Sequence, residues 1–155
     1  MRTANATVFG LYASYACIII NVASPPLQVL PGDRVFEVGC DFGIATRIMA
    51  EAGAESVCAV DISREHVAAA SAEYGSDTVR FEVLDAICDL DGLSRLGARC
   101  QKVFVDINGN REIDAVVRCV SNVQRVIAPD VIVVKSVALA RAFALILAGS
   151  AGVVV

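Results

Sequence analysis

Residues 34–43, which read RVFEVGCDFG, give the clearest indication of the fold class. Its first five residues, mostly valine and phenylalanine, predict a strand. Gly39 then allows a tight turn, and Gly43 lets the helix that follows pack close to the strand. The spacing of apolar residues predicts that helix over residues 44–52. A strand, a glycine loop and a helix in direct succession are typical of a parallel α/β sheet.

The same alternation of strand and helix continues along the chain. Apolar runs predict five strands, at residues 34–38, 57–60, 78–84, 103–105 and 131–134. Residues 78–84 alternate apolar and polar side chains, which places that strand at an edge of the sheet. Because crossovers between parallel strands are right-handed, we expect a doubly wound α/β sheet of order 3-2-1-4-5 with helices on both faces.

Composition narrows the class of protein. The chain has 155 residues, of which 56% are hydrophobic and 19% charged, so a folded domain with one core is expected. A net charge of -4 argues against duplex DNA as a partner, because no basic surface is available. Six cysteines without a C-x-x-C pair and a single histidine argue against a metal site and a disulfide framework. We expect reduced thiols and a cytoplasmic protein.

The N-terminal part of the chain allows two interpretations. Residues 6–23 are strongly apolar and follow Arg2, as in a signal peptide or a short membrane anchor. Polar residues interrupt this stretch, and the β-branched run at residues 18–22 favours a buried strand. We expect the segment to pack on the core, without a membrane partner.

Acidic residues stand at the ends of the first two predicted strands. Glu37 lies just before the glycine turn, and Asp41 occupies the place of the middle glycine of a dinucleotide-binding loop. Two carboxylates there would repel a diphosphate and favour a ligand with positive charge. Asp61 lies 22 positions after Gly39, where a carboxylate accepts hydrogen bonds from a ribose diol. The pattern therefore favours a nucleoside with a cationic tail.

With these residues the sequence resembles the class I S-adenosylmethionine-dependent methyltransferases. Their signature is an acidic residue followed by G-x-x-x-G at the end of the first strand, which Glu37, Gly39 and Gly43 match. The resemblance implies S-adenosylmethionine as cofactor and methyl transfer to an unidentified acceptor. It also implies a Rossmann-like methyltransferase domain over residues 32–155, preceded by an N-terminal apolar segment of residues 1–31.

The resemblance assigns roles to acids at the strand ends. It implies that Asp61 binds the ribose, that Asp85 lies near the adenine and that Asp106 faces the reactive methyl group. Together with the glycine loop, the candidates for contact with the cofactor are Glu37, Gly39, Cys40, Asp41, Gly43, Asp61, Asp85 and Asn108. The candidates for catalysis are Asp106 and Lys135.

The acceptor is less well indicated. Residues 106–111 read DINGNR and lack the proline and the aromatic residue of the motif in enzymes that methylate exocyclic amines. If the fourth and fifth strands are neighbours, Asp106 and Lys135 could meet above the sheet. Such a pair looks like part of the constellation in ribose 2′-O-methyltransferases, which makes RNA the acceptor class to consider. The plainer interpretation is a solvated salt bridge, since Lys102, the other lysine, lies at the far end of its strand.

Two other functions are compatible with the sequence. One is a catalytically inactive methyltransferase-like module that binds the cofactor or a partner. The other is a nicotinamide-dependent oxidoreductase, which Asp41 disfavours. His66 lies beside the apolar stripe of its helix, so we expect a partly exposed helix residue rather than a catalytic base.

The edge of the fifth strand raises a separate question. Sheets of the family normally end in an antiparallel hairpin beside this strand, and the sequence pattern predicts no such hairpin after residue 148. The edge is then exposed, covered by the N-terminal segment, or used to form a homo-oligomer.

Overall fold

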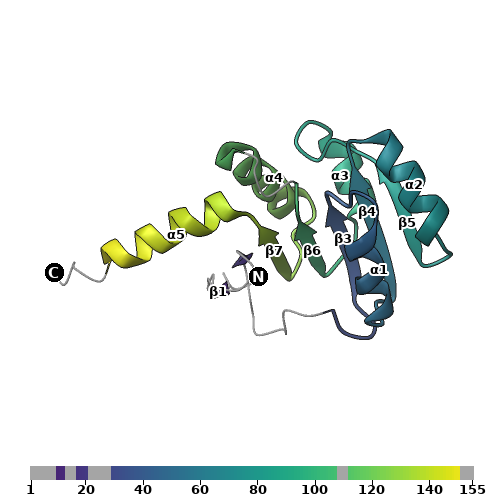
Figure 1. The fold of residues 1–155 in the computed structure, drawn as a ribbon, viewed down its shortest axis with the longest axis horizontal. Coiled ribbons are helices and arrows are strands. Elements are labelled where there is room, and N and C mark those ends of the chain that lie inside the picture. Colours follow the sequence, from purple (N-terminus) through teal and green to yellow (C-terminus); the bar gives the residue numbers. More distant parts are fainter. Residues whose placement is uncertain (1–9, 13–16, 21–28, 108–111, 151–155) are drawn as a thin grey trace, which may run out of the picture.

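The computed structural model describes residues 10–12, 17–20, 29–107 and 112–150. They form a seven-stranded sheet of order β1-β2-β7-β6-β3-β4-β5 (Figure 1). The strands are β1 (Gly10–Tyr12), β2 (Cys17–Ile20), β3 (Arg34–Val38), β4 (Ser56–Asp61), β5 (Val79–Val83), β6 (Lys102–Val105) and β7 (Val131–Lys135). The five strands from β3 onward pair in parallel, in the order 3-2-1-4-5 that the sequence predicts. The predicted fold class is therefore confirmed.

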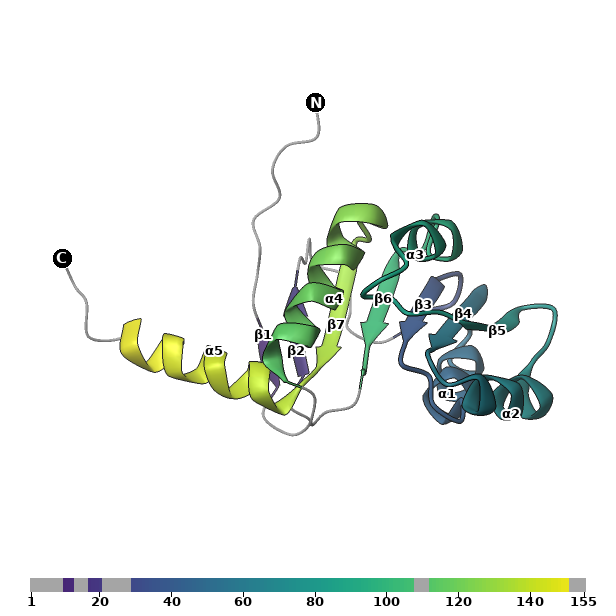
Figure 2. The same ribbon diagram turned by 90° about the horizontal axis from the view of Figure 1, so that it is seen from above.

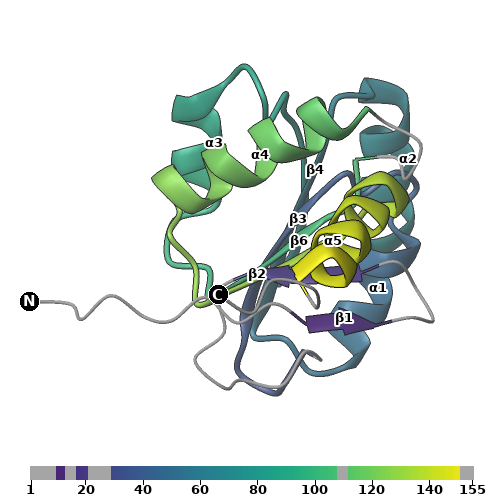
Figure 3. The same ribbon diagram turned by 90° about the vertical axis from the view of Figure 1, so that its left-hand side faces the viewer.

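Helices cover both faces of this parallel sheet. They are α1 (Ile44–Glu51), α2 (Arg64–Tyr74), α3 (Leu90–Leu96), α4 (Ile113–Val126) and α5 (Val137–Ser150). Figure 3 shows α1 and α2 on one side of the sheet and α3 and α4 on the other. The start of α5 packs through Leu139 into the apolar cluster that α3 and α4 share, and the helix then runs away from the sheet (Figure 2).

Burial along the strands follows their place in the sheet. Val35 and Phe36 in the central strand β3 are fully buried, because helices cover both of its faces. In β5 the residues alternate, with Val79 and Phe81 buried and Arg80 exposed, as expected for an edge strand with one solvated face. The sequence analysis predicted this edge position correctly.

The opposite edge of the parallel sheet is covered by an N-terminal hairpin. β2 pairs antiparallel with β7, with Ile19 opposite Val133, and β1 pairs antiparallel with β2. The open edge that a homo-oligomer was expected to use is therefore occupied by this chain itself. The hairpin lies where the resemblance places a C-terminal one, but it precedes the parallel strands in the chain. Within the part of the chain that the structure describes, no helix has both the length and the apolar character that crossing a membrane requires.

Candidate functional site

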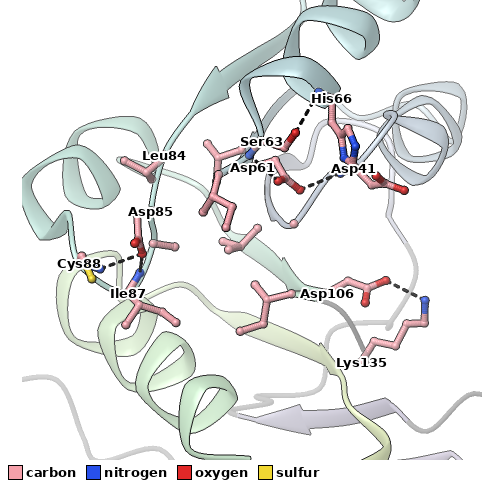
Figure 4. A pocket seen from close by; sticks show the side chains of 16 residues that line it. Asp41, Asp61, Ser63, His66, Leu84, Asp85, Ile87, Cys88, Asp106 and Lys135 are labelled. Carbon is pink, nitrogen blue, oxygen red and sulfur yellow. Dashed lines mark hydrogen bonds and ion pairs between the residues drawn. The ribbon is translucent and has the colours of Figure 1, made fainter. Parts of the chain in front are cut away.

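A cavity of about 790 Å³ lies at the carboxyl ends of the parallel strands (Figure 4). Its walls come from the segments that follow β3, β4, β5 and β6, together with the end of β7. This is where the strand order reverses between β3 and β6, the place where doubly wound sheets bind ligands. Six residues singled out in the sequence line it: Gly39, Asp41, Asp61, Asp85, Asp106 and Lys135.

Asp61, at the end of β4, links this strand to the glycine loop. One carboxylate oxygen accepts a hydrogen bond from the backbone N–H of Ser63 at 2.9 Å, and the other accepts one from the N–H of Asp41 at 3.0 Å. These two donors hold the carboxylate at the cavity wall. About two of its lone-pair positions remain for a ligand.

Asp85, after β5, is oriented by a turn of its own. Its Oδ1 accepts hydrogen bonds from the backbone N–H groups of Ile87 at 2.9 Å and Cys88 at 3.0 Å. The Cys88 side chain also hydrogen-bonds this carboxylate, which raises the pKa of the thiol. Asp85 therefore enters the cavity with a defined orientation, on the wall across from Lys135 (Figure 4).

Gly39 is required by the backbone of β6. It adopts a φ of +90°, and a Cβ built on it would lie 2.1 Å from the carbonyl oxygen of Asp106. The glycine-loop pattern predicts a tight turn at Gly39 and makes it a candidate for contact with the cofactor. The contact that excludes a side chain is with the strand end that carries Asp106.

Gly43 allows close packing between the glycine loop and two neighbouring elements. Its φ is +81°, and an added Cβ would lie 3.0 Å from the ring of Phe81 in β5 and from Ala70 in α2. We expected Gly43 to let α1 pack close to β3, but the close contacts at this glycine are with α2 and with the edge strand β5.

Two candidates of the glycine loop are buried behind the cavity wall rather than on it. Glu37 and Cys40 are each 3% exposed. The Thr46 hydroxyl in α1 donates a hydrogen bond to Glu37. Burial, assisted by the charges of Asp106 and Asp61, raises the pKa of Glu37 to about 7 despite this hydrogen bond. Burial likewise raises the pKa of Cys40 to about 12, which fits a packing role for its thiol.

Asp106 and Lys135 meet above the sheet, as their strand positions predict. The Lys135 Nζ lies 2.7 Å from the Asp106 Oδ2, and both side chains are partly exposed. Lys102 begins β6 at the opposite end of the sheet, where its side chain is almost fully buried in an ion pair with Asp33. Asn108 lies outside the described residues.

His66 lines the cavity, a position that the sequence analysis missed. Its Nδ1 lies 2.7 Å from Asp41 Oδ1, and its ring lies 4.3 Å from the ring of Phe42, measured between centroids. The helix begins at Arg64 after the N-cap Ser63, so His66 belongs to the first turn, beside the carboxyl end of β4. That nearness to the N-cap was the available signal, because first-turn residues of such helices lie at the ligand-binding edge of the sheet.

The fold and this cavity define a class: a doubly wound α/β domain with an acidic ligand site at the carboxyl edge of its sheet. A family model described as a methyltransferase domain matches residues 35–130. The match covers more than half of the chain. The protein therefore belongs to the methyltransferase-domain family, within the class I S-adenosylmethionine-dependent superfamily.

Solved structures resemble the chain over part of their length. A TehB-like methyltransferase from Corynebacterium glutamicum has a TM-score of 0.52 at 17% identity, over 64% of this chain and 52% of that one. A protein described as a zinc-dependent alcohol dehydrogenase from Rhodobacter sphaeroides reaches 0.55 at 16%, over 66% and 40%. A methyltransferase from Mesorhizobium loti is 26% identical, over 51% and 35%, with a TM-score of 0.41.

The two structures with TM-scores above 0.5 support the fold, which enzymes of different chemistry share. The chain spans between 35% and 52% of the length of these three structures. No curated protein matches the sequence significantly.

Proposed function

We propose that the domain binds S-adenosylmethionine in the acidic cavity and transfers its methyl group to an acceptor. The observation that carries this proposal is the convergence of four aspartates, from four successive strand ends, on one cavity: Asp41, Asp61, Asp85 and Asp106. Their charge favours a cationic nucleoside and disfavours a diphosphate. Membership of the methyltransferase-domain family supports the same ligand.

The residues of the cavity fit the parts of this cofactor. Asp61, held by two backbone N–H groups, has lone pairs left to accept hydrogen bonds from the ribose hydroxyls. Asp85 offers a carboxylate to the exocyclic amine of the adenine. Gly39 brings the loop backbone close to the end of β6, which supports a position of the cationic tail near Asp106.

The remaining cofactor candidates that the structure describes are not among the residues that line the cavity. Glu37 and Cys40 are buried, so their contribution is the shape of the loop. Gly43 allows α1 to start against α2 and β5. Asn108 remains a candidate on the sequence alone.

The acceptor side of the site is the Asp106–Lys135 pair. When bound, S-adenosylmethionine supplies a methyl group on a positively charged sulfur, which a nucleophile attacks in line. Asp106 and Lys135 lie 2.7 Å apart, so the Asp106 carboxylate can take the proton of a hydroxyl acceptor while the Lys135 ammonium stabilises the negative charge that develops on its oxygen. This arrangement favours a hydroxyl group, with the ribose 2′-hydroxyl of RNA as the specific class.

A cofactor-binding module without transfer activity is the second candidate. The observation that favours it is the place of Lys102, which is buried in an ion pair with Asp33 at the far end of the sheet. Lys102 therefore contributes no second amine to the acceptor side.

Calorimetric titration with S-adenosylhomocysteine and with NAD tests the ligand. We expect S-adenosylhomocysteine to bind and Asp61→Ala to weaken binding by more than about 1 kcal/mol, because buried hydrogen bonds are lost. Asp77→Ala is the matched control, because Asp77 is an exposed aspartate outside the cavity lining. Binding of NAD without any response to S-adenosylhomocysteine would overturn the proposal in favour of an oxidoreductase.

Incubation with a radiolabelled methyl donor tests the transfer step. RNA, protein and small-molecule pools are offered separately, and label in RNA that is lost with Lys135→Met would support the ribose hydroxyl. Cofactor binding without label in any pool would favour the inactive module.

A further inference from the structure

We propose that His66 is a positioning residue that closes a ring of hydrogen bonds around Asp61 and holds the glycine loop at the cavity. The inference rests on the proposed function, because the ring encloses the carboxylate proposed to bind the ribose. Neither the family signature nor the sequence pattern assigns a role to this histidine.

The ring joins four residues through backbone N–H groups and side chains, and it returns to its start (Figure 4). The backbone N–H of Ser63 donates to Asp61, and the Ser63 hydroxyl accepts from the N–H of His66 at 3.2 Å. The His66 imidazole then contacts the Asp41 carboxylate at 2.7 Å, and the N–H of Asp41 donates back to Asp61 at 3.0 Å. The end of β4, the start of α2 and the glycine loop are thereby tied together, and all four residues line the cavity.

Asp41 needs the contact with His66 because its backbone conformation is unfavourable. Asp41 has a φ of +49°, in the left-handed region that residues other than glycine seldom adopt. Its side chain is 67% exposed, so packing does not hold the residue in place. The contact with His66 restrains its carboxylate, and the Phe42 ring lies tilted against the imidazole, with 4.3 Å between the ring centroids.

The contact also separates two carboxylates. Asp41 donates its backbone N–H to Asp61 while its own carboxylate turns to His66. Without the imidazole, the Asp41 carboxylate loses its partner, and the N–H that orients Asp61 is no longer restrained. We therefore expect His66 to act on the cofactor through Asp61, without contact with the reacting atoms.

Three substitutions of His66 test the ring by calorimetric titration with S-adenosylhomocysteine. His66→Ala should weaken binding by about tenfold, the loss expected for one charge-assisted hydrogen bond. In His66→Asn the side-chain amide lies near the position of Nδ1, so affinity should stay within about threefold of the wild type. In His66→Gln the amide lies near the position of Nε2, and this variant should behave like His66→Ala.

A purely structural role would not produce this order of variants, and thermal melting without ligand checks that all three fold. If His66→Ala and His66→Gln fold and bind S-adenosylhomocysteine as tightly as the wild type, the inference is wrong. If the wild type itself does not bind, the proposed function is wrong and the inference falls with it. The two failures are therefore distinguishable.

A spectroscopic measurement tests the ring without ligand. His66 is the single histidine of the sequence, so its imidazole nitrogen signals in NMR spectra need no assignment. Asp41→Asn should shift the Nδ1 signal strongly, because the carboxylate that accepts its hydrogen bond becomes a neutral amide. Asp77→Asn, at an exposed site outside the ring, should leave the signal in place. An unchanged signal in Asp41→Asn would overturn the inference.

Discussion

Glu37 shows how the acidic residue of the glycine-loop signature is built into the core. It is 3% exposed, and burial raises its pKa to about 7 from an ordinary value of 4.5. The folded protein therefore keeps this proton at pH values where the unfolded chain has released it. The contribution of Glu37 to the free energy of unfolding is largest below pH 4.5, falls as the pH rises through about 7, and costs on the order of 3 kcal/mol above it.

Replacement of this carboxyl by an amide should remove that pH dependence. We expect Glu37→Gln to match the wild type near pH 4.5 and to exceed it in stability at pH 8, because the amide carries no charge to desolvate. Urea unfolding at both pH values measures the difference. Glu73→Gln, on the exposed side of α2, should follow the wild-type profile. Equal stability of Glu37→Gln and wild type at pH 8 would contradict the prediction.

Replacing a glycine can cost free energy in two ways, through backbone conformation and through steric overlap. Comparison of Gly39 with Gly32 separates these two costs. Both have a φ near +90°, but a Cβ at Gly32 meets nothing within 4 Å, whereas at Gly39 it lies 2.1 Å from the Asp106 carbonyl oxygen. Gly32→Ala should lose roughly 1–2 kcal/mol of unfolding free energy, from conformation alone. Gly39→Ala should lose roughly a further 1–3 kcal/mol, because the end of β6 must move. Denaturant unfolding of both variants measures this, and equal losses would show that β6 does not constrain the loop.

At the scale of elements, the N-terminal hairpin completes the sheet. β2 lies between β1 and β7 and pairs antiparallel with both. An edge strand left unpaired offers its backbone groups to other chains, so this pairing protects β7 from association. The stability of β7 therefore depends on residues more than a hundred positions earlier in the chain.

A proline in β2 tests that dependence. Ile19 pairs with Val133 in β7, and proline at this position has no N–H and restricts the backbone. We expect Ile19→Pro to lower the free energy of unfolding by about 3 kcal/mol and to speed amide exchange in β7. Ile19→Val keeps the N–H and the branched side chain, so exchange there should match the wild type. Protection of β7 that survives the proline would show that the pairing contributes little.

At the scale of the whole molecule, the two ends of the sheet differ in structure and in proposed role. The carboxyl end carries the acidic cavity, whereas the amino end carries the buried Lys102–Asp33 pair, whose Nζ–Oδ2 distance is 2.6 Å. Asp33 also accepts a hydrogen bond from the backbone of Leu30, at the entry to β3. A buried ion pair tied to backbone groups fits a structural role for this end.

Hydrogen exchange should separate the two ends when ligand is added. We expect S-adenosylhomocysteine to slow exchange at residues 39–43, 61–66 and 85–88, because these segments form the cavity wall. Exchange at residues 30–33 and 97–101, at the amino end, should not change. Mass spectrometry of the exchanged peptides measures both, and uniform protection of both ends would show a global effect instead of binding at the cavity.

The order of the five parallel strands and the acids at their ends could be predicted from the sequence. Alternating apolar runs and the half-polar pattern of residues 78–84 are local signals, and crossover handedness converts them into a strand order. The positions of Asp61, Asp85, Asp106 and Lys135 on one rim follow from that order, because parallel strands end at the same edge. For this reason the meeting of Asp106 and Lys135 could be predicted.

Which side chains face the cavity, and which segment covers β7, could not be predicted from local patterns of residues. Glu37 lies behind the wall, where it contacts Thr46 of α1, and His66 lies on the wall, where it contacts Asp41. Neither contact appears in a linear pattern, because each joins separate elements. The N-terminal hairpin pairs with a strand far away in the sequence. Pairing between distant segments depends on the free energy of the assembled sheet, which no local stretch of residues encodes.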